Sequence, residues 1–202
     1  PFSLQTGSDF IDLSEVQPHE EALRMVPKEV AEKGGFIPLV VMEEGRLSIG
    51  ITNPSNIVAV DTVTKLTGKQ PQVFLVDNDH YQETLEKSYF FFAHPIQQRV
   101  DQIIAVLKQA TGAIPGATIA ELVELIMMDG IRKQATDIHI SPADDVTNVF
   151  YRIDGVLQHG HCLQKLAHAG LVSRIKVLSQ LDIAEQRLPQ DGCFTYEFLS
   201  KR

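Results

Sequence analysis

Residues 149–157 read Val-Phe-Tyr-Arg-Ile-Asp-Gly-Val-Leu and contain the strongest short-range fold signal in the chain. Val149, Tyr151 and Ile153 recur at every second position, as expected for a strand with one buried face. Asp154-Gly155 then joins this strand to the next apolar pair. An Asp-Gly pair between alternating segments is typical of a two-residue hairpin turn. We therefore expect two antiparallel strands here.

The sequence on either side of this hairpin alternates between helical and extended patterns. Thr118 and Glu121 are spaced as a capping box, so we expect Thr118 to cap a helix whose buried residues include Ile119, Leu122, Val123, Ile126 and Met127. Further along we expect a strand at 137–140, a helix at 167–178 and a strand at 194–198, where Phe194, Tyr196 and Phe198 alternate.

Residues 1–92 also mix helices and strands. We expect short helices after Pro18 and Pro27, strands at 36–42, 47–51 and 73–76, a helix with the apolar stripe Val58, Val63 and Leu66, and a helix that begins at Asp77. An amphipathic helix at 95–111 follows, and Gly112 to Gly116 breaks it.

These patterns predict an α/β (α+β) chain of two small mixed domains joined by a helical linker. We place the domains at 1–92 and 118–202, with the linker at 93–117. The charge changes at the same place, because residues 1–92 carry −7 and the remainder −1. The chain starts without Met and stops within a strand-like segment, so we expect it to be part of a longer protein.

The composition excludes several classes of function. The net charge of −8 argues against a protein that coats nucleic acid or an anionic membrane. Cys162 and Cys193 are too few for a disulfide framework, so a reducing cytoplasm is expected. The sequence contains no GxxxxGK[ST] and no GxGxxG. We therefore do not expect these residues to hydrolyse a nucleotide.

Two groups of residues could in principle do chemistry. His159 and His161 lie two apart on a predicted strand and could share a face toward one zinc, with Cys162 beside them and Cys193 as a distant ligand. The usual CxxC half-site is missing, so we favour a solvated strand end. The acids Asp137, Asp154, Asp182 and Asp191 are better explained by turns and element ends. We assign no catalytic residue and no metal ligand.

Four basic residues are the candidates for a binding role: Arg152, Arg174, Lys176 and Arg187. Such side chains bind phosphates or acidic protein surfaces. On spacing alone, a solvated rim with weak ion pairs is the simpler interpretation.

Three ordered stretches add to these patterns: ATDIHI at 135–140, YRIDGVL at 151–157, and SRIKVL at 173–178 leading to LDIAEQRLPQDG at 181–192. Together they resemble the domain before the motor core of the type II secretion and type IV pilus assembly ATPases. Residues 1–92 resemble the N-terminal domain of that family more loosely.

This resemblance implies the N-terminal docking and coupling region of a hexameric ATPase at the cytoplasmic face of the bacterial inner membrane. The full-length protein would bind ATP and Mg²⁺ in a core beyond Arg202, and this part would hold no cofactor. Residues 1–92 would dock a membrane-anchored platform protein, and 118–202 would contact a neighbouring subunit's core through Arg152, Arg174, Lys176 and Arg187. No nucleic acid partner is implied.

Two alternatives remain open. Phe150 and Cys193 stand where the family often has arginine, which motivates a non-catalytic adaptor. A small-ligand sensor, for a cyclic dinucleotide, is the other, although the tandem RLGxxL-type motifs that bind cyclic di-GMP in some relatives are absent here. Secretion, pilus assembly and DNA import are not distinguished by these residues.

Overall fold

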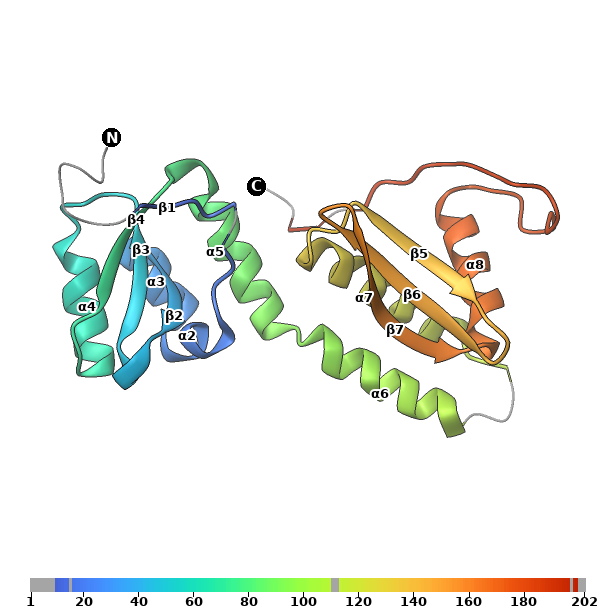
Figure 1. Cartoon of the computed structure of the whole chain (residues 1–202), viewed down its shortest axis with the longest axis horizontal. Coiled ribbons are helices and arrows are strands. Elements are labelled where there is room, and N and C mark those ends of the chain that lie inside the picture. Colours follow the sequence, from blue (N-terminus) through green and yellow to red (C-terminus); the bar gives the residue numbers. More distant parts are fainter. Residues whose placement is uncertain (1–9, 15, 110–112, 197, 200–202) are drawn as a thin grey trace. The chain divides into compact units, whose positions relative to one another are not determined.

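The computed structural model describes residues 10–14, 16–109, 113–196 and 198–199. The chain divides into two compact units, one ending at His94 and the other beginning at Pro95. Each unit combines helices with a β-sheet (Figure 1), which confirms the α/β (α+β) class. The predicted domain roles and the predicted linker at 93–117 stay predictions. Gly112, where the linker helix was expected to break, lies outside the described residues.

The first unit is built on a four-stranded sheet in the order β1-β4-β3-β2. Strands β1 and β3 run parallel to β4, whereas β2 is antiparallel to β3. The strands are β1 (Phe10–Ile11), β2 (Phe36–Val41), β3 (Leu47–Ile51) and β4 (Gln72–Val76). The helices are α2 (Glu20–Met25), α3 (Lys28–Gly34), α4 (Ile57–Thr67) and α5 (Asn78–Ala93), with the 3-10 turn η1 (Glu43–Gly45).

Local signals set the ends of these helices. Gly35 and Gly68 adopt left-handed φ values of 63° and 72° at the ends of α3 and α4, where a side chain would be strained. Asp77 caps α5 by accepting a hydrogen bond from the His80 amide. Asn56 caps α4, and its side-chain amide also donates to the carbonyls of Gly34 and Gly35. This one side chain therefore joins the start of α4 to the end of α3.

The core of the first unit corrects one prediction. The stripe Val58, Val63 and Leu66 was expected to be buried, but only Val63 is. Ala59 accompanies Val63 in the core, one helical turn away, while Val58 is 65% exposed and Leu66 47% exposed. Helix α4 is therefore rotated so that the i, i+4 pair faces inward. The core side chains from the other elements include Leu23, Phe36, Ile49, Leu75, Leu85 and Tyr89.

The second unit has an antiparallel three-stranded sheet, β5-β6-β7, with helices α7 and α8 packed on it. The strands are β5 (Asp137–Pro142), β6 (Val146–Ile153) and β7 (Val156–Gln164). Helices α6 (Ile96–Gln109) and α8 (Leu166–Leu178) both pack against α7 (Gly116–Arg132). The predicted hairpin is confirmed, because Asp154 and Gly155 adopt φ values of 49° and 78° between β6 and β7.

Two local predictions in this unit are wrong. Helix α7 begins at Gly116 with Pro115 as its N-cap residue, so Thr118 lies inside the first turn and caps nothing. The Pro115 carbonyl accepts hydrogen bonds from the amides of Thr118 and Ile119, so the helix starts upstream of the Thr118 hydroxyl. The strand expected at 194–198 does not form in residues 194–196 and 198, which the structure describes outside any strand. Alternation alone does not make a strand.

Candidate functional site

Lys176, one of the four basic residues with a candidate binding role, lies near the C-terminal end of α8 and contacts the segment that follows. Its Nζ donates a hydrogen bond to the carbonyl of Glu185. We call residues 181–190 the post-α8 loop. The Gln190 side chain bridges this loop: its Nε2 donates to the carbonyl of Asp182 at 2.9 Å, and its Oε1 accepts from the Asp182 amide at 2.8 Å. Lys176 therefore holds the loop rather than standing free.

Arg174 and Arg187 are placed differently from Lys176. Arg187 is exposed on the post-α8 loop. Arg174 is half-buried on α8, and its Nε is a buried donor with no hydrogen-bond partner within the described part of the chain. A buried N–H without a partner is unusual and costly. Arg174 thus has an unused donor on the same helix that anchors the loop.

Arg152 lies on the face of β6 opposite to Tyr151. Its Nε is 3.1 Å from Oδ2 of Asp137 on β5, and its Nη1 donates to the carbonyl of Gly155 at 3.2 Å. The pair is well exposed, so it adds little stability and leaves Arg152 open to another anion. Among the described residues, no hydrogen bond or ion pair links Arg152 to Arg174, Lys176 or Arg187.

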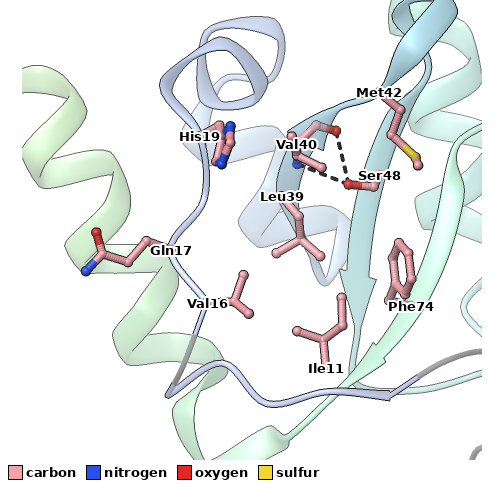
Figure 2. Close-up of a pocket in the computed structure, with 9 residues that line it drawn as sticks. All are labelled: Ile11, Val16, Gln17, His19, Leu39, Val40, Met42, Ser48 and Phe74. Carbon is pink, nitrogen blue, oxygen red and sulfur yellow. Dashed lines mark hydrogen bonds between the residues drawn. The ribbon is translucent and has the colours of Figure 1, made fainter. Parts of the chain in front are cut away.

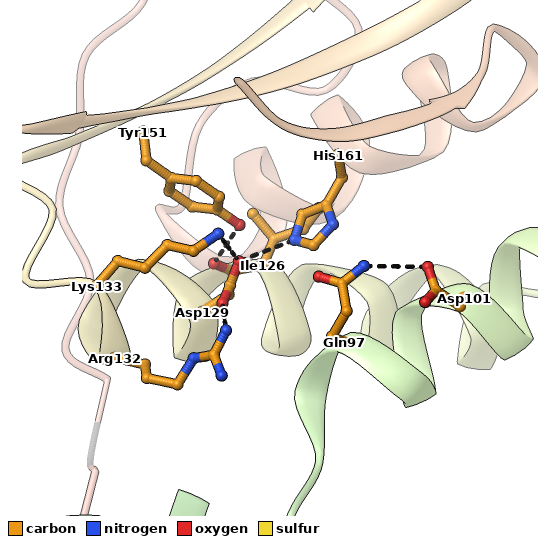
Figure 3. Close-up of polar contacts among 8 residues, drawn as sticks. All are labelled: Gln97, Asp101, Ile126, Asp129, Arg132, Lys133, Tyr151 and His161. Atoms are coloured by element: carbon orange, nitrogen blue, oxygen red, sulfur yellow. Dashed lines mark hydrogen bonds and ion pairs between the residues drawn. The ribbon is translucent and has the colours of Figure 1, made fainter. Parts of the chain in front are cut away.

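A buried charge cluster that the sequence analysis did not identify lies between α7 and the sheet (Figure 3). Asp129 is fully buried and binds Arg132 at 2.9 Å, Lys133 at 2.6 Å and, from β7, His161 at 3.0 Å. The Lys133 Nζ also lies 4.5 Å above the centre of the Tyr151 ring. The i, i+3, i+4 spacing of Asp129, Arg132 and Lys133 at the C-terminal end of α7 was the available signal, but it is also common on solvated helices.

Electrostatics keep Asp129 ionised. Burial alone would raise its pKa, but hydrogen bonds from His161 and Lys133 and the charges of Lys133 and Arg132 outweigh burial and lower the pKa well below its usual range. Burial raises the pKa of Tyr151 well above its usual range, and the charge of Asp129 adds to this effect. The Tyr151 hydroxyl donates to the carbonyl of Ile126. This arrangement ties the end of α7 to the sheet.

The paired histidines do not share a face. The register between β6 and β7 shifts by one residue at Gly160, so that Val149 opposes His161 while Phe150 opposes His159. His161 is buried against Asp129, whereas His159 is exposed and contacts Asn148 Oδ1 at 3.1 Å. The zinc geometry considered from the sequence is therefore wrong for this pair.

A second set of potential ligands lies in the first unit, where single ligand atoms of Asp12, Asp77 and His80 fall within 4.8 Å of one another. Both carboxylates already accept local hydrogen bonds, Asp12 from Ser14 and Asp77 from the amides of Leu13 and His80. These bonds fix the end of β1 and the start of α5, which explains the cluster structurally.

The first unit also contains a pocket of about 190 Å³ (Figure 2). Its lining residues are Ile11, Val16, Gln17, His19, Leu39, Val40, Met42, Ser48 and Phe74. The Ser48 hydroxyl in this lining is already hydrogen-bonded. It donates to the Val40 carbonyl and accepts from the Val40 amide. The lining contains no arginine or lysine, and His19 is its one ionisable side chain.

The comparisons with known proteins match both units. A family model described as MshEN domain matches residues 6–90, and one described as Type II/IV secretion system protein matches residues 114–202. The type IV pilus assembly ATPase PilB of Myxococcus xanthus is 34% identical over 200 residues, which cover 94% of this chain and 35% of PilB.

The chain carries the N-terminal domains of the type II secretion and type IV pilus assembly ATPase family. Type II secretion system protein E of Xanthomonas campestris is 31% identical over 159 residues, covering 74% of this chain and 27% of that protein. A solved structure of MshE with cdg aligns with a TM-score of 0.40 at 15% identity, covering 44% of this chain and 63% of that chain. The chain spans about a third of the length of the family members that it matches.

Each of the two matched regions corresponds closely to one of the two units. The MshEN match ends before His94, and the secretion-protein match begins just before α7 and includes the post-α8 loop. Helix α6 falls between the two matches. None of the helices in the described residues has the length and apolar character needed to cross a membrane.

Proposed function

We propose that this chain is the docking and coupling region of a hexameric cytoplasmic ATPase that powers type II secretion or type IV pilus assembly at the inner face of the bacterial inner membrane. The order of the two family domains, residues 6–90 followed by 114–202, carries the proposal. The sequence lacks a phosphate loop, so ATP and Mg²⁺ would bind in a motor core elsewhere in the parent protein.

The second unit is the part that would contact a neighbouring subunit's core. Arg152 and Arg187 present exposed guanidinium groups, and Arg174 has a buried N–H without a partner in the described residues. Arginines in such positions suit carboxylates or phosphates across an interface. Lys176 donates to the Glu185 carbonyl of the post-α8 loop, and its part in this contact stays a prediction.

The first unit would dock a membrane-anchored platform protein of the secretion or pilus machine. Its sequence carries −7 of the total charge of −8. An acidic unit favours a partner with a basic face, and such complementarity speeds and orients association. The pocket in this unit is lined by no arginine or lysine. Sensing of a cyclic dinucleotide gains no support from this pocket and stays a prediction.

The proposal that the parent protein is an ATPase motor is tested by sequencing its gene beyond the codon for Arg202. A GxxxxGK[ST] placed after a strand and before a helix would support it. A stop codon, or a following domain without that lysine, would overturn it in favour of a non-catalytic adaptor.

The contact residues are tested in the parent protein. We expect Arg174→Ala and Arg187→Ala each to weaken hexamer assembly and lower the ATPase rate several-fold, whereas Arg46→Ala, an exposed arginine of the first unit, leaves both unchanged. Analytical ultracentrifugation and steady-state ATPase assays give the two readouts. If both variants assemble and turn over like the wild type, these arginines do not form the contact.

A further inference from the structure

A β-bulge in the edge strand β2 forms one side of the pocket in the first unit (Figure 2). Against β3, Pro38 pairs with Ile49 and Val40 pairs with Ser48, so the register skips Leu39. Successive residues of a regular strand point to opposite faces of the sheet, but a bulge can turn two of them the same way. Leu39 and Val40 accordingly both line the pocket.

The facing side of the pocket comes from the segment that joins β1 to α2. Hydrogen bonds hold this segment at both ends. The Leu13 amide donates to Asp77 Oδ1 at 2.9 Å, and the His19 amide donates to the Leu39 carbonyl at 2.8 Å. Between these two contacts, Val16 lies half-buried in the pocket lining. A site whose walls are already fixed loses little entropy when a ligand enters it.

The space between these walls is apolar and large enough for an aromatic ring. Figure 2 shows the side chains of Ile11, Val16, Leu39 and Phe74 around it, whereas Gln17 points away. The volume is about 190 Å³. An apolar cavity of about 150 Å³ is enough to bind benzene.

Two lining residues favour an aromatic ligand over an aliphatic one, and the charge of the unit disfavours an anion. Phe74 offers a ring for offset-stacked or edge-to-face contact, and Met42 offers a thioether sulfur, which packs well against aromatic rings. Residues 1–92 carry a charge of −7, and no arginine or lysine in the lining offsets it. The ligand that fits best is therefore aromatic and uncharged.

His19 supplies one polar group at the end of the pocket nearest α2. Its ring makes no hydrogen bond to any residue that the structure describes, and it does not cap α2, which begins at the next residue. A neutral imidazole carries one acceptor nitrogen. A ligand with an N–H or O–H group at this end would therefore find an acceptor.

We propose that this pocket binds a small uncharged aromatic molecule with one N–H or O–H donor, of the indole or phenol class. The ring lies among Val16, Leu39 and Phe74, and the donor faces His19. This ligand site goes beyond the proposed function. Its test uses the whole chain without ATP or a partner, so it succeeds or fails independently of the docking and coupling role.

Indole is the probe, because the chain contains no tryptophan and indole fluorescence therefore reports binding directly. At pH 8 we expect saturable binding with a Kd of about 0.1–1 mM and a blue shift of the indole emission. Nuclear Overhauser contacts from indole to the methyl groups of Ile11, Leu39 and Val40 should locate the ligand. An absence of saturable binding up to about 5 mM overturns the proposal, as do contacts confined to residues outside the lining.

A matched pair of variants tests the pocket itself. Val16→Phe places a ring in the space and should weaken indole binding at least about tenfold. Val58→Phe makes the same change at a position that is 65% exposed on α4 and outside the lining, so it should keep the wild-type Kd. Thermal unfolding shows that both variants fold. If Val16→Phe binds indole as the wild type does, this pocket is not the site.

A ligand series tests the two chemical requirements. 1-Methylindole lacks the donor and should bind several-fold more weakly than indole, and benzoate should not compete because it is charged. His19→Leu keeps the backbone hydrogen bond to Leu39 and should bring indole and 1-methylindole to similar affinities. An unchanged preference for indole in His19→Leu overturns the role of His19. Competition by benzoate at the same concentration as indole overturns the choice of an uncharged ligand.

Discussion

Asp129 is the residue on which the buried polar contacts of the second unit converge, and its charge should be important for stability. Asp129→Asn keeps the shape but removes the charge that Lys133 and His161 face. We expect a loss of about 3 kcal/mol in the free energy of unfolding at pH 7, as for a buried ion pair deprived of one partner. Urea denaturation followed by circular dichroism measures this. Asp101→Asn on the exposed side of α6 is the control, expected within about 0.5 kcal/mol of the wild type.

The same carboxyl group predicts a pH dependence. Its pKa is lowered in the folded state, so the stability that it contributes is complete above the unfolded pKa of about 3.9 and is lost as the pH falls below that value. The difference in unfolding free energy between the wild type and Asp129→Asn should therefore shrink as the solution is acidified below about pH 4. A difference that grows below pH 4 would contradict the assignment.

Gly160 provides a steric prediction at the bulge. A Cβ added there would lie 2.2 Å from Cε2 of Tyr151, closer than any real contact. Gly160→Ala should therefore displace the ring and cost about 1–3 kcal/mol, as overpacking does. Gly116→Ala is the matched control, because nothing lies within 4 Å of its Cβ at the start of α7. Thermal unfolding and the Tyr151 ring resonances report the two effects, and an unperturbed ring would contradict the prediction.

At the level of elements, α4 allows two similar side chains to be compared. Val63 is fully buried, whereas Val58 on the same helix is 65% exposed. Val63→Ala should cost about 2 kcal/mol through lost burial and a residual cavity. Val58→Ala should stay within about 0.5 kcal/mol of the wild type. Chemical denaturation of the two variants checks the rotation of α4, and equal losses would mean that the apolar stripe expected from the sequence was right.

The elements also show which sequence signals are enough to predict a local structure. The Asp154-Gly155 hairpin and the helix ends at Gly35 and Gly68 were predictable, because each depends on a positive φ that few residues adopt. The bulge at Gly160 was not, because a register shift depends on the partner strand and on the Tyr151 ring packed there. The first helical turn of α7 was misplaced because Pro115 and Thr118 are both good start signals and only packing decides between them.

For the candidate site, the sequence predicted which residue types could bind a partner but not which were already engaged. Arg152 and Arg187 are exposed, as a contact requires. Lys176 was grouped with them by charge, yet it donates to Glu185 within the same unit. That hydrogen bond joins α8 to a loop whose path no periodicity describes, so only the three-dimensional arrangement shows that Lys176 contacts the loop. The Asp129 cluster was missed for the same reason, since His161 reaches it from a distant strand.

At the scale of the whole chain, each unit closes its own core, so we expect the two to unfold as separate cooperative units. The buried cluster of the first unit draws on elements from residue 13 to residue 89, whereas the Asp129 cluster lies entirely in the second. Val63→Ala should lower the midpoint of one thermal transition and Asp129→Asn that of the other, by about 4–8 °C for each kcal/mol lost. Hydrogen exchange resolved by peptide assigns each transition to its unit. If either variant accelerated global exchange equally in both units, the chain would unfold as a single cooperative unit.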